Sequence, residues 1–320
     1  MKVIACAGRD DLATVYLAEM GDGKVVEFVE SLQPPLTREE KWVTILSTLY
    51  GCPVKCPICD AGSCYRGKLT KQDMLAQLDF LVKRRYPSGS IPARKFKVQF
   101  ARMGEPAYNT AVLDVLKELP SRYDAPALMP CISTIAPTGV ESFFESLLAI
   151  KQELYPGRFQ LQFSIHSTDS AERDWLIPTK KWDFARIARY GERFQQSGDR
   201  KITLNFALVR DVSVDADELL KYFNPDIFLI KITPLNPTHR AVSSKLATYI
   251  DPARQGESYQ VVEKLRSCGY QVIVSIGETE ENQIGSNCGQ YVTRHLSNQT
   301  ELENAYQYPL RHYQQRETVL

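Results

Sequence analysis

Three cysteines, Cys52, Cys56 and Cys59, lie within eight residues in the run GCPVKCPIC. Cysteine thiolate is the usual ligand of iron–sulfur clusters, so this C-x3-C-x2-C spacing can hold three irons of a cubane 4Fe–4S cluster. The fourth iron is then open to a small molecule. Reductive cleavage of S-adenosylmethionine (SAM) requires such an open iron, because SAM chelates it through its amino and carboxylate groups.

Two other interpretations of these cysteines are open. A structural zinc site needs four ligands in a closed tetrahedron, and Cys64 would complete the set, although zinc ligands usually come as two C-x2-C pairs. A disulfide is disfavoured, because eight cysteines in 320 residues are sparse and the start MKVIACAGRD lacks the pattern of a secretory signal. The sequence therefore favours reduced thiols and a cytoplasmic protein.

The composition excludes some functions and leaves others open. With 320 residues, 43% of them hydrophobic, the chain can bury one large core or two smaller ones. No window approaches 18 consecutive apolar residues, so we expect no membrane span. The formal net charge of +1 provides no overall field that would attract nucleic acid.

The elements that position the cysteines follow from the hydrophobic pattern. Short apolar runs predict strands over residues 42–50, 95–101, 128–134, 159–165, 202–208, 227–233 and 270–276. Amphipathic stretches predict helices between them, over 71–85, 110–119, 139–154, 184–196, 216–223 and 256–268. This alternation indicates βαβ units and a parallel sheet, which right-handed crossovers curl into a partial or full (β/α) barrel.

The ends of the chain differ from this pattern. Two β-type runs flank Gly21-Asp22-Gly23, which is a hairpin signal, so residues 1–41 are predicted to form a small β appendage with a linker. The barrel core is assigned to residues 42–292, and residues 293–320 to a C-terminal extension.

Chemically rich segments follow several of the predicted strands. They are the cysteine run, ARMGEP, the pair ST, HST and PLNP. Ligands of parallel α/β sheets gather at the carboxyl ends of the strands. We therefore expect these segments to surround one site.

Taken together, these segments resemble the RlmN/Cfr-type adenine C2-methyltransferases of the radical SAM superfamily, over about residues 20–292. That family methylates adenosine in ribosomal and transfer RNA. The resemblance implies a radical SAM barrel, a 4Fe–4S cluster on Cys52, Cys56 and Cys59, SAM as cofactor, and a reductant such as flavodoxin or ferredoxin. It also implies an RNA or nucleotide substrate.

The strand-end motifs carry the family's SAM contacts. FARMGEPAYN is similar to the family's MGMGEPLLN, which implies that Gly104 and Glu105 bind the SAM amino group. CISTIAPTG resembles LSTSG and implies that Ser133 lies near the SAM carboxylate or ribose. FSIHS resembles ISLHA, so Ser164 and His166 would line the SAM site.

Three further residues are implied by the same resemblance. ITPLNP is similar to LIPWNP, which assigns Asn236 to SAM. GSNCGQ resembles AACGQL, in which the cysteine is methylated and carries the methyl group to the substrate; this residue is Cys288. GDGKVVEFV resembles DGEAVETVY, whose glutamate is the family's proton acceptor, and this residue is Glu27.

The chain also departs from the family. The second family cysteine, seven residues before the first cluster ligand, is replaced by Ile45, which cannot resolve a covalent adduct between the methylated cysteine and the base. Cys64 is a candidate replacement. Only about 40 residues precede the barrel, so the RNA-binding extension of the ribosomal enzyme is not expected, and Ile58 replaces an aromatic residue.

Three hypotheses remain. The first is a methyltransferase that acts through a methylated Cys288, as the GSNCGQ motif favours. The second is a radical SAM enzyme whose 5′-deoxyadenosyl radical acts directly on a small molecule, nucleotide or peptide, as Ile45 favours. The third is a non-enzymatic iron–sulfur or zinc RNA-binding module, which leaves the motifs at the strand ends unexplained.

Overall fold

The computed structural model describes residues 1–251, 259–277, 279–286, 291–292, 302 and 305–313, and its strands form one sheet. The strands are β1 (Lys2–Arg9), β2 (Ala13–Glu19), β3 (Val25–Ser31), β4 (Trp42–Leu46), β5 (Phe96–Phe100), β6 (Leu128–Thr134), β7 (Gln160–Ser164), β8 (Ile202–Leu208), β9 (Phe228–Pro234), β10 (Val272–Val274) and β11 (Arg311–His312). They are arranged in the order β10-β9-β8-β7-β6-β5-β4-β3-β2-β1-β11.

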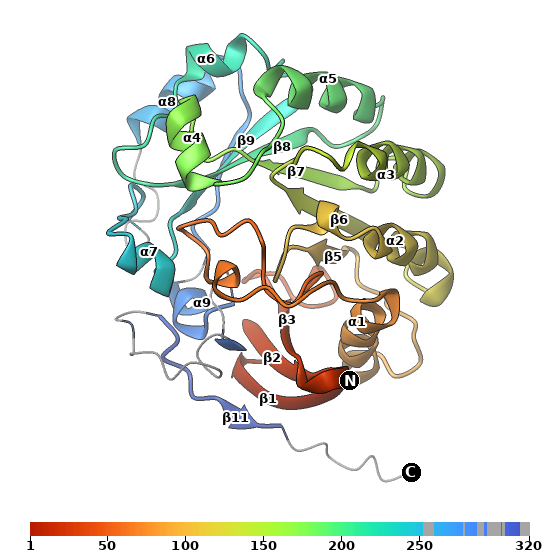
Figure 1. The fold of residues 1–320 in the computed structure, drawn as a ribbon. Helices are drawn as coiled ribbons and strands as arrows, with labels where there is room; N and C mark the ends of the chain where they lie inside the picture. The colour runs from red at the N-terminus through yellow and green to blue at the C-terminus, as the bar shows by residue number, and fades with distance from the viewer. Residues whose placement is uncertain (252–258, 278, 287–290, 293–301, 303–304, 314–320) are drawn as a thin grey trace.

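The part of the sheet from β4 to β10 is parallel, and the pairs β3–β4, β2–β3, β1–β2 and β1–β11 are antiparallel. Figure 1 shows the strands curving around the centre of the molecule. Within the described residues β10 pairs with β9 alone, so the two sheet edges are not joined. The fold is a partial (β/α) barrel, as the alternation of strands and helices predicts.

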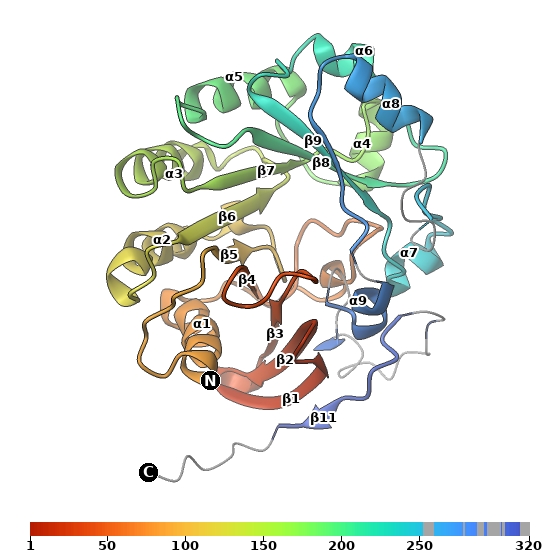
Figure 2. The same cartoon turned by 180° about the vertical axis from the view of Figure 1, so that it is seen from behind.

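Helices α1 (Lys71–Arg85), α2 (Ala111–Arg122), α3 (Glu141–Leu154), α5 (Phe184–Phe194), α6 (Ala216–Leu220) and α8 (Gln260–Ser267) cover the outer side of this curved sheet (Figure 2). The other described helices are α4 (Ser170–Leu176), α7 (His239–Ser243) and α9 (Thr279–Ile284), with 3-10 turns η1 (Gly21–Gly23), η2 (Asp60–Ser63) and η3 (Pro106–Tyr108). The start of α1 is fixed by a capping box, in which Thr70 and Asp73 each accept the other's backbone N–H.

The two faces of the sheet differ in how deeply their side chains are buried. Fully buried residues, such as Phe96, Val98 and Phe100 of β5, alternate with half-buried ones, and the buried set packs into the large core. The half-buried inner positions are in register across the sheet: Ile45 pairs with Gln99, and Ser164 pairs with Asn205. The inner face therefore carries the polar strand residues that a ligand could reach.

The N-terminal strands extend this sheet. β2 and β3 form the predicted antiparallel hairpin around η1. β1, which the hydrophobic pattern did not reveal, pairs with both β2 and β11. The division into residues 1–41, 42–292 and 293–320 stays a prediction. None of the described helices combines the length and apolar character that crossing a membrane requires.

Candidate cluster and cofactor site

The three cysteines of the motif lie on the loop between β4 and η2, and each is half-buried. The loop is held from the end of β9: Arg240 Nε donates to the Cys56 carbonyl at 3.0 Å, and Arg240 Nη2 donates to the Lys55 carbonyl at 2.8 Å. The Thr238 hydroxyl donates to the Ile58 carbonyl at 3.1 Å. The loop is therefore shaped by side chains of the strand-end segment PLNPTHR.

A second, smaller apolar cluster surrounds these cysteines. It contains buried side chains from several strand ends and packs against Cys52 and Cys56; its buried members are Val54, Ile135, Leu176, Ile177, Val209, Leu235 and Ala241. Burial raises the pKa of Cys52 to about 11 and that of Cys56 to about 12. Because iron binds thiolate, cluster loading must release these protons. An apolar shell of this kind governs solvent access and redox potential at metal centres.

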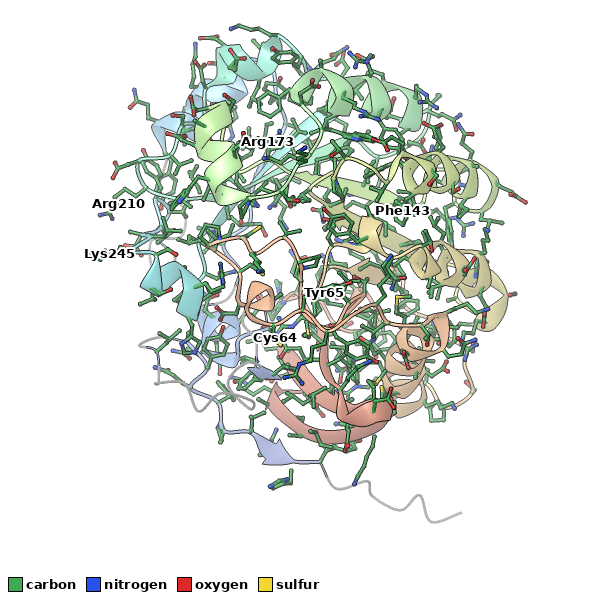
Figure 3. All side chains as sticks on the ribbon, in the orientation of Figure 1. Cys64, Tyr65, Phe143, Arg173, Arg210 and Lys245 are labelled. Carbon is green, nitrogen blue, oxygen red and sulfur yellow. The ribbon has the colours of Figure 1, made fainter. Side chains whose placement is uncertain are left out.

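The chemistry of the three thiols suits an iron–sulfur cluster. Among the described residues, no group of three or more His, Cys, Asp or Glu side chains is placed to hold a metal ion. Cys64 is exposed, and Arg66 Nε lies 3.1 Å from its sulfur. Figure 3 shows Cys64 and Tyr65 on the loop before α1, away from Phe143 on the outer helix α3. Three neighbouring half-buried thiols are a suitable donor set for the corners of a 4Fe–4S cluster.

Glu105 lies beside the cysteine loop at the end of β5. Its carboxylate is 5% exposed and accepts hydrogen bonds from Thr134 Oγ1 at 2.5 Å, Ile135 N at 2.9 Å and Ala107 N at 3.0 Å. These donors are neutral, and no ion pair with Glu105 exists among the described residues. Burial raises the pKa of Glu105 to about 7. A buried carboxylate without a basic partner suits an ammonium ligand such as the SAM amino group.

Gly104 allows the turn that presents Glu105. Its φ is +100°, and a Cβ at this position would lie 2.5 Å from the Leu49 side chain. Glycine is therefore required both by the backbone conformation and by the close packing. The structure thus places Gly104 and Glu105 together at a strand end, next to the loop that carries Cys52.

The remaining predicted contacts sit along neighbouring strand ends. Ser133 is half-buried on β6 and accepts a hydrogen bond from Gln162 Nε2 at 2.9 Å. Ser164 is half-buried at the end of β7, and Asn236 is half-buried after β9. The parallel register places Ser133 and Ser164 on the same inner face. Their direct contact with SAM stays a prediction.

His166 follows Ser164 and is 8% exposed with a φ of +65°. Its Nδ1 accepts the Ala207 backbone N–H at 3.0 Å. Burial, together with the Arg173 guanidinium, lowers the pKa of His166 to about 4. The imidazole is therefore neutral at physiological pH, and one of its nitrogens is already used in joining the ends of β7 and β8.

Glu27 is completely buried on β3 and forms an ion pair with Arg102, whose Nη2 lies 2.6 Å from Glu27 Oε1. Burial raises the pKa of Glu27, and Arg102 together with the Val292 amide opposes this rise. Arg102 was not among the residues predicted from the sequence. The available signal was the charged side chain inside ARMGEP, where the quoted family motif has glycine.

Cys288, the predicted methyl carrier, lies outside the described residues. Its neighbours Gly285 and Ser286 on one side and Val292 on the other are described, and all three are buried. Ile45, at the position of the missing family cysteine, is half-buried on the inner face of β4 and pairs with Val29 of β3. A cavity of about 350 Å³ lined by Tyr123, Leu128 and other residues lies at the amino ends of the strands, far from this site.

Several known proteins are similar to this chain in sequence, although no protein-family model matches it. The probable dual-specificity RNA methyltransferase RlmN of Thermobifida fusca is 28% identical over 282 residues, which are 84% of this chain and 71% of the relative. The same-named protein of Streptomyces griseus is 26% identical over 91% of this chain and 76% of its own length. That of Pseudothermotoga lettingae is 27% identical over 71% of this chain and 63% of its own length. This chain is therefore similar to RlmN-type RNA methyltransferases over most of its length.

A solved structure supports the fold of this RlmN-like chain. A radical SAM methyltransferase from Sphaerobacter thermophilus superimposes with a TM-score of 0.67, covering 91% of this chain and 81% of the other at 20% identity. The radical SAM family implies SAM and a 4Fe–4S cluster, and the thiols and carboxylate described above fit both. The chain spans 63% of the length of the Pseudothermotoga relative.

Proposed function

We propose that this chain is a radical SAM methyltransferase that transfers a methyl group to a base of RNA or of a nucleotide through Cys288. The observation that carries the proposal is Glu105, a buried carboxylate that accepts only neutral donors and lies beside the cysteine loop. When bound, the cluster supplies an electron for SAM cleavage. Glu105 holds the ammonium group of SAM in this proposal, and Cys52, Cys56 and Cys59 hold the cluster.

The chain's own residues orient the cofactor and exclude water. The apolar side chains around Cys52 and Cys56, among them Val54 and Ile135, keep the reacting end of the site dry. His166 stays neutral and fixes the ends of β7 and β8 through the Ala207 amide. Cys288 serves as methyl carrier in this proposal, as the GSNCGQ motif supports.

An RNA substrate is supported by the surface around the strand ends. Exposed aromatic side chains occur there at Tyr65, Trp175 and Tyr249, with exposed fractions of 42%, 50% and 43%. The exposed cations Arg210 and Lys245 lie at the margin of the same face (Figure 3). Surfaces that bind single-stranded nucleic acid typically combine aromatic and basic side chains.

We propose flavodoxin or ferredoxin as the reductant.

A second candidate function is favoured by Ile45. This inner-face residue replaces the thiol that would resolve a methylcysteine adduct. An enzyme of the second kind would abstract hydrogen directly from a small molecule, nucleotide or peptide and would transfer no methyl group.

One experiment separates the two functions. The reconstituted protein is incubated with SAM, dithionite and an adenosine-containing RNA fragment, and the Cys288 peptide is weighed. Methyl transfer predicts a Cys288 peptide heavier by one methylene group and a methylated RNA, both of which Cys288→Ala abolishes. Direct abstraction predicts an unmodified thiol and 5′-deoxyadenosine formation that persists in Cys288→Ala. Cys52→Ala should abolish 5′-deoxyadenosine in either case, and its persistence would contradict radical SAM chemistry.

A further inference from the structure

The ion pair between Glu27 and Arg102 joins two distant parts of the barrel. Glu27 lies on β3 and Arg102 lies two residues after the end of β5, and their side chains are 0% and 2% exposed. Charges removed from water so completely are costly unless hydrogen bonds satisfy their remaining atoms. The hydrogen-bond partners of these two side chains therefore indicate the structural role of the ion pair.

Arg102 binds the segment that follows α9. Its Nη2 donates to the Gly285 carbonyl at 2.8 Å, and its Nη1 donates to the Ser286 carbonyl at 2.8 Å. Gly285 has a φ of +72°, and a Cβ on it would lie 2.8 Å from the Tyr306 ring. Arg102 thus fixes the chain directly at the end of α9.

Glu27 binds the other side of the same stretch of chain. Its Oε2 accepts the Val292 backbone N–H at 3.0 Å. One ion pair therefore holds both Ser286 and Val292, six positions apart in the sequence. Cys288 lies between these two anchored residues in the sequence.

Helix α9, which precedes this stretch, is also held in place, by side chains of β1 and β3. Arg9 Nη1 lies 2.8 Å from Glu280 of α9, and the Ser31 hydroxyl donates to Glu281 at 3.3 Å. α9 is therefore docked on the N-terminal strands, and Arg102 and Glu27 fix the chain beyond it.

We propose that Glu27 and Arg102 are positioning residues that together clamp both flanks of the Cys288 segment to the ends of β3 and β5. A proton on Glu27 would leave Arg102 as a buried cation without its partner, which is strongly unfavourable. The clamp is particular to this chain's ARMGEP motif, because the family motif quoted above has glycine at the position of Arg102.

The first test measures the clamp without any catalysis, so its result is independent of the proposed methyl transfer. Hydrogen–deuterium exchange is followed in the cluster-loaded protein for a peptide that covers residues 285–292. Arg102→Met and Glu27→Gln should each speed exchange roughly tenfold or more, because each weakens the charge-assisted hydrogen bonds to Gly285 and Ser286 or to Val292. Exchange in the peptide that covers β8 should not change.

A matched control uses another buried ion pair. Lys151 on α3 pairs with Asp199, and their side chains are 1% and 7% exposed, but the pair is remote from residues 285–292. Lys151→Met should leave exchange of residues 285–292 unchanged. Unchanged exchange in Arg102→Met and Glu27→Gln, or an equal acceleration in Lys151→Met, would overturn the clamp.

The second measurement distinguishes positioning from a general structural role. The ratio of Cys288 methylation to 5′-deoxyadenosine formation should fall at least tenfold in Arg102→Met, because SAM still binds at Glu105 while the Cys288 segment is released. A loss of both activities in equal proportion would contradict positioning. If Glu27→Gln abolishes RNA methylation while the exchange of residues 285–292 stays as in the unmodified protein, Glu27 does not act by positioning this segment and the proposal fails.

Discussion

The Thr134 hydroxyl donates a hydrogen bond of 2.5 Å to the Glu105 carboxylate and joins the end of β6 to the end of β5. Thr134 also accepts the Ala136 backbone N–H at 3.0 Å. The carboxylate is thus oriented by a side chain whose own rotamer is fixed. A preorganised anion of this kind can bind a cationic ligand without first losing side-chain freedom.

Removing the charge of Glu105 should weaken SAM binding. Glu105→Gln keeps the shape of the side chain and loses the anion that would hold an ammonium group. We expect the Kd for SAM, measured by equilibrium dialysis on the cluster-loaded protein, to rise between about tenfold and a hundredfold. Asp114→Asn, which changes an exposed carboxylate on α2, should have no effect. An unchanged Kd in Glu105→Gln would contradict the assignment.

His166 should make the fold sensitive to acid. Its folded pKa of about 4 lies below the value of about 6.5 for an unfolded histidine. The unfolded chain therefore binds more protons in this window, and stability is lost as the pH falls from about 6.5 to about 4. At pH 5 the expected loss is about 2 kcal/mol.

The measurement for this prediction is urea unfolding of the cluster-free protein at pH 7 and pH 5. His166→Gln should lose less stability than the unmodified protein between these two values. His312→Gln, which alters an exposed histidine of β11, should behave like the unmodified protein. Parallel losses in the unmodified protein and His166→Gln would show that His166 titrates normally.

Gly51 should be essential for the cysteine loop. Its φ is +77°, and a Cβ would lie 1.6 Å from the Cys64 carbonyl oxygen, so backbone must move to admit alanine. We expect Gly51→Ala to lower the free energy of unfolding by about 3 kcal/mol or more and to reduce the iron bound per chain after reconstitution.

Gly67→Ala is the matched control for Gly51→Ala. Gly67 also has a positive φ, +114°, but nothing lies within 4 Å of its added Cβ. The Gly67→Ala variant should lose only about 1 kcal/mol of its free energy of unfolding and should bind as much iron as the unmodified protein. Equal effects of the two substitutions would mean that backbone strain, and not the contact with Cys64, causes the loss of stability and of bound iron in Gly51→Ala.

Position 45 should accept a functional thiol. Ile45 is half-buried on the inner face of β4, opposite Gln99 of β5, where a side chain can face the site. If methyl transfer requires a resolving thiol, Ile45→Cys should increase the moles of methylated RNA formed per mole of protein, at a stability cost of about 1 kcal/mol. Ile45→Ser, of similar size but without sulfur, should not. An increase with serine would exclude thiol chemistry as the cause.

The elements with the strongest local signals could be predicted from the sequence. The bounds of β6, β8 and α1 agree with those that the apolar runs and the amphipathic stretch indicate. Short elements were missed because few residues define their periodicity: α4, α7 and α9 have seven, five and six residues. β1 was missed although it pairs with β2 along its length, because its pattern does not alternate clearly.

The site was predictable only where a motif is continuous in sequence. The cysteine run and Gly104–Glu105 are each local, so spacing revealed them. Arg102 acquires its meaning from Glu27 and Ser286, which are distant in sequence, and no local pattern records such a contact. The same limit applies to Arg240, whose guanidinium shapes the loop around Cys56.

The contact between Glu27 and Val292 spans 265 positions of a 320-residue chain. During synthesis, the strand that carries Glu27 leaves the ribosome long before its partner exists, whereas the cysteine loop and the Glu105 turn are complete in the first third of the chain. A nascent chain can therefore present the parts that hold the cluster and SAM before Glu27 and Arg102 have their C-terminal partners. When Arg102 binds Ser286 and Glu27 binds Val292, a strand from the N-terminal part of the chain becomes joined to the C-terminal part.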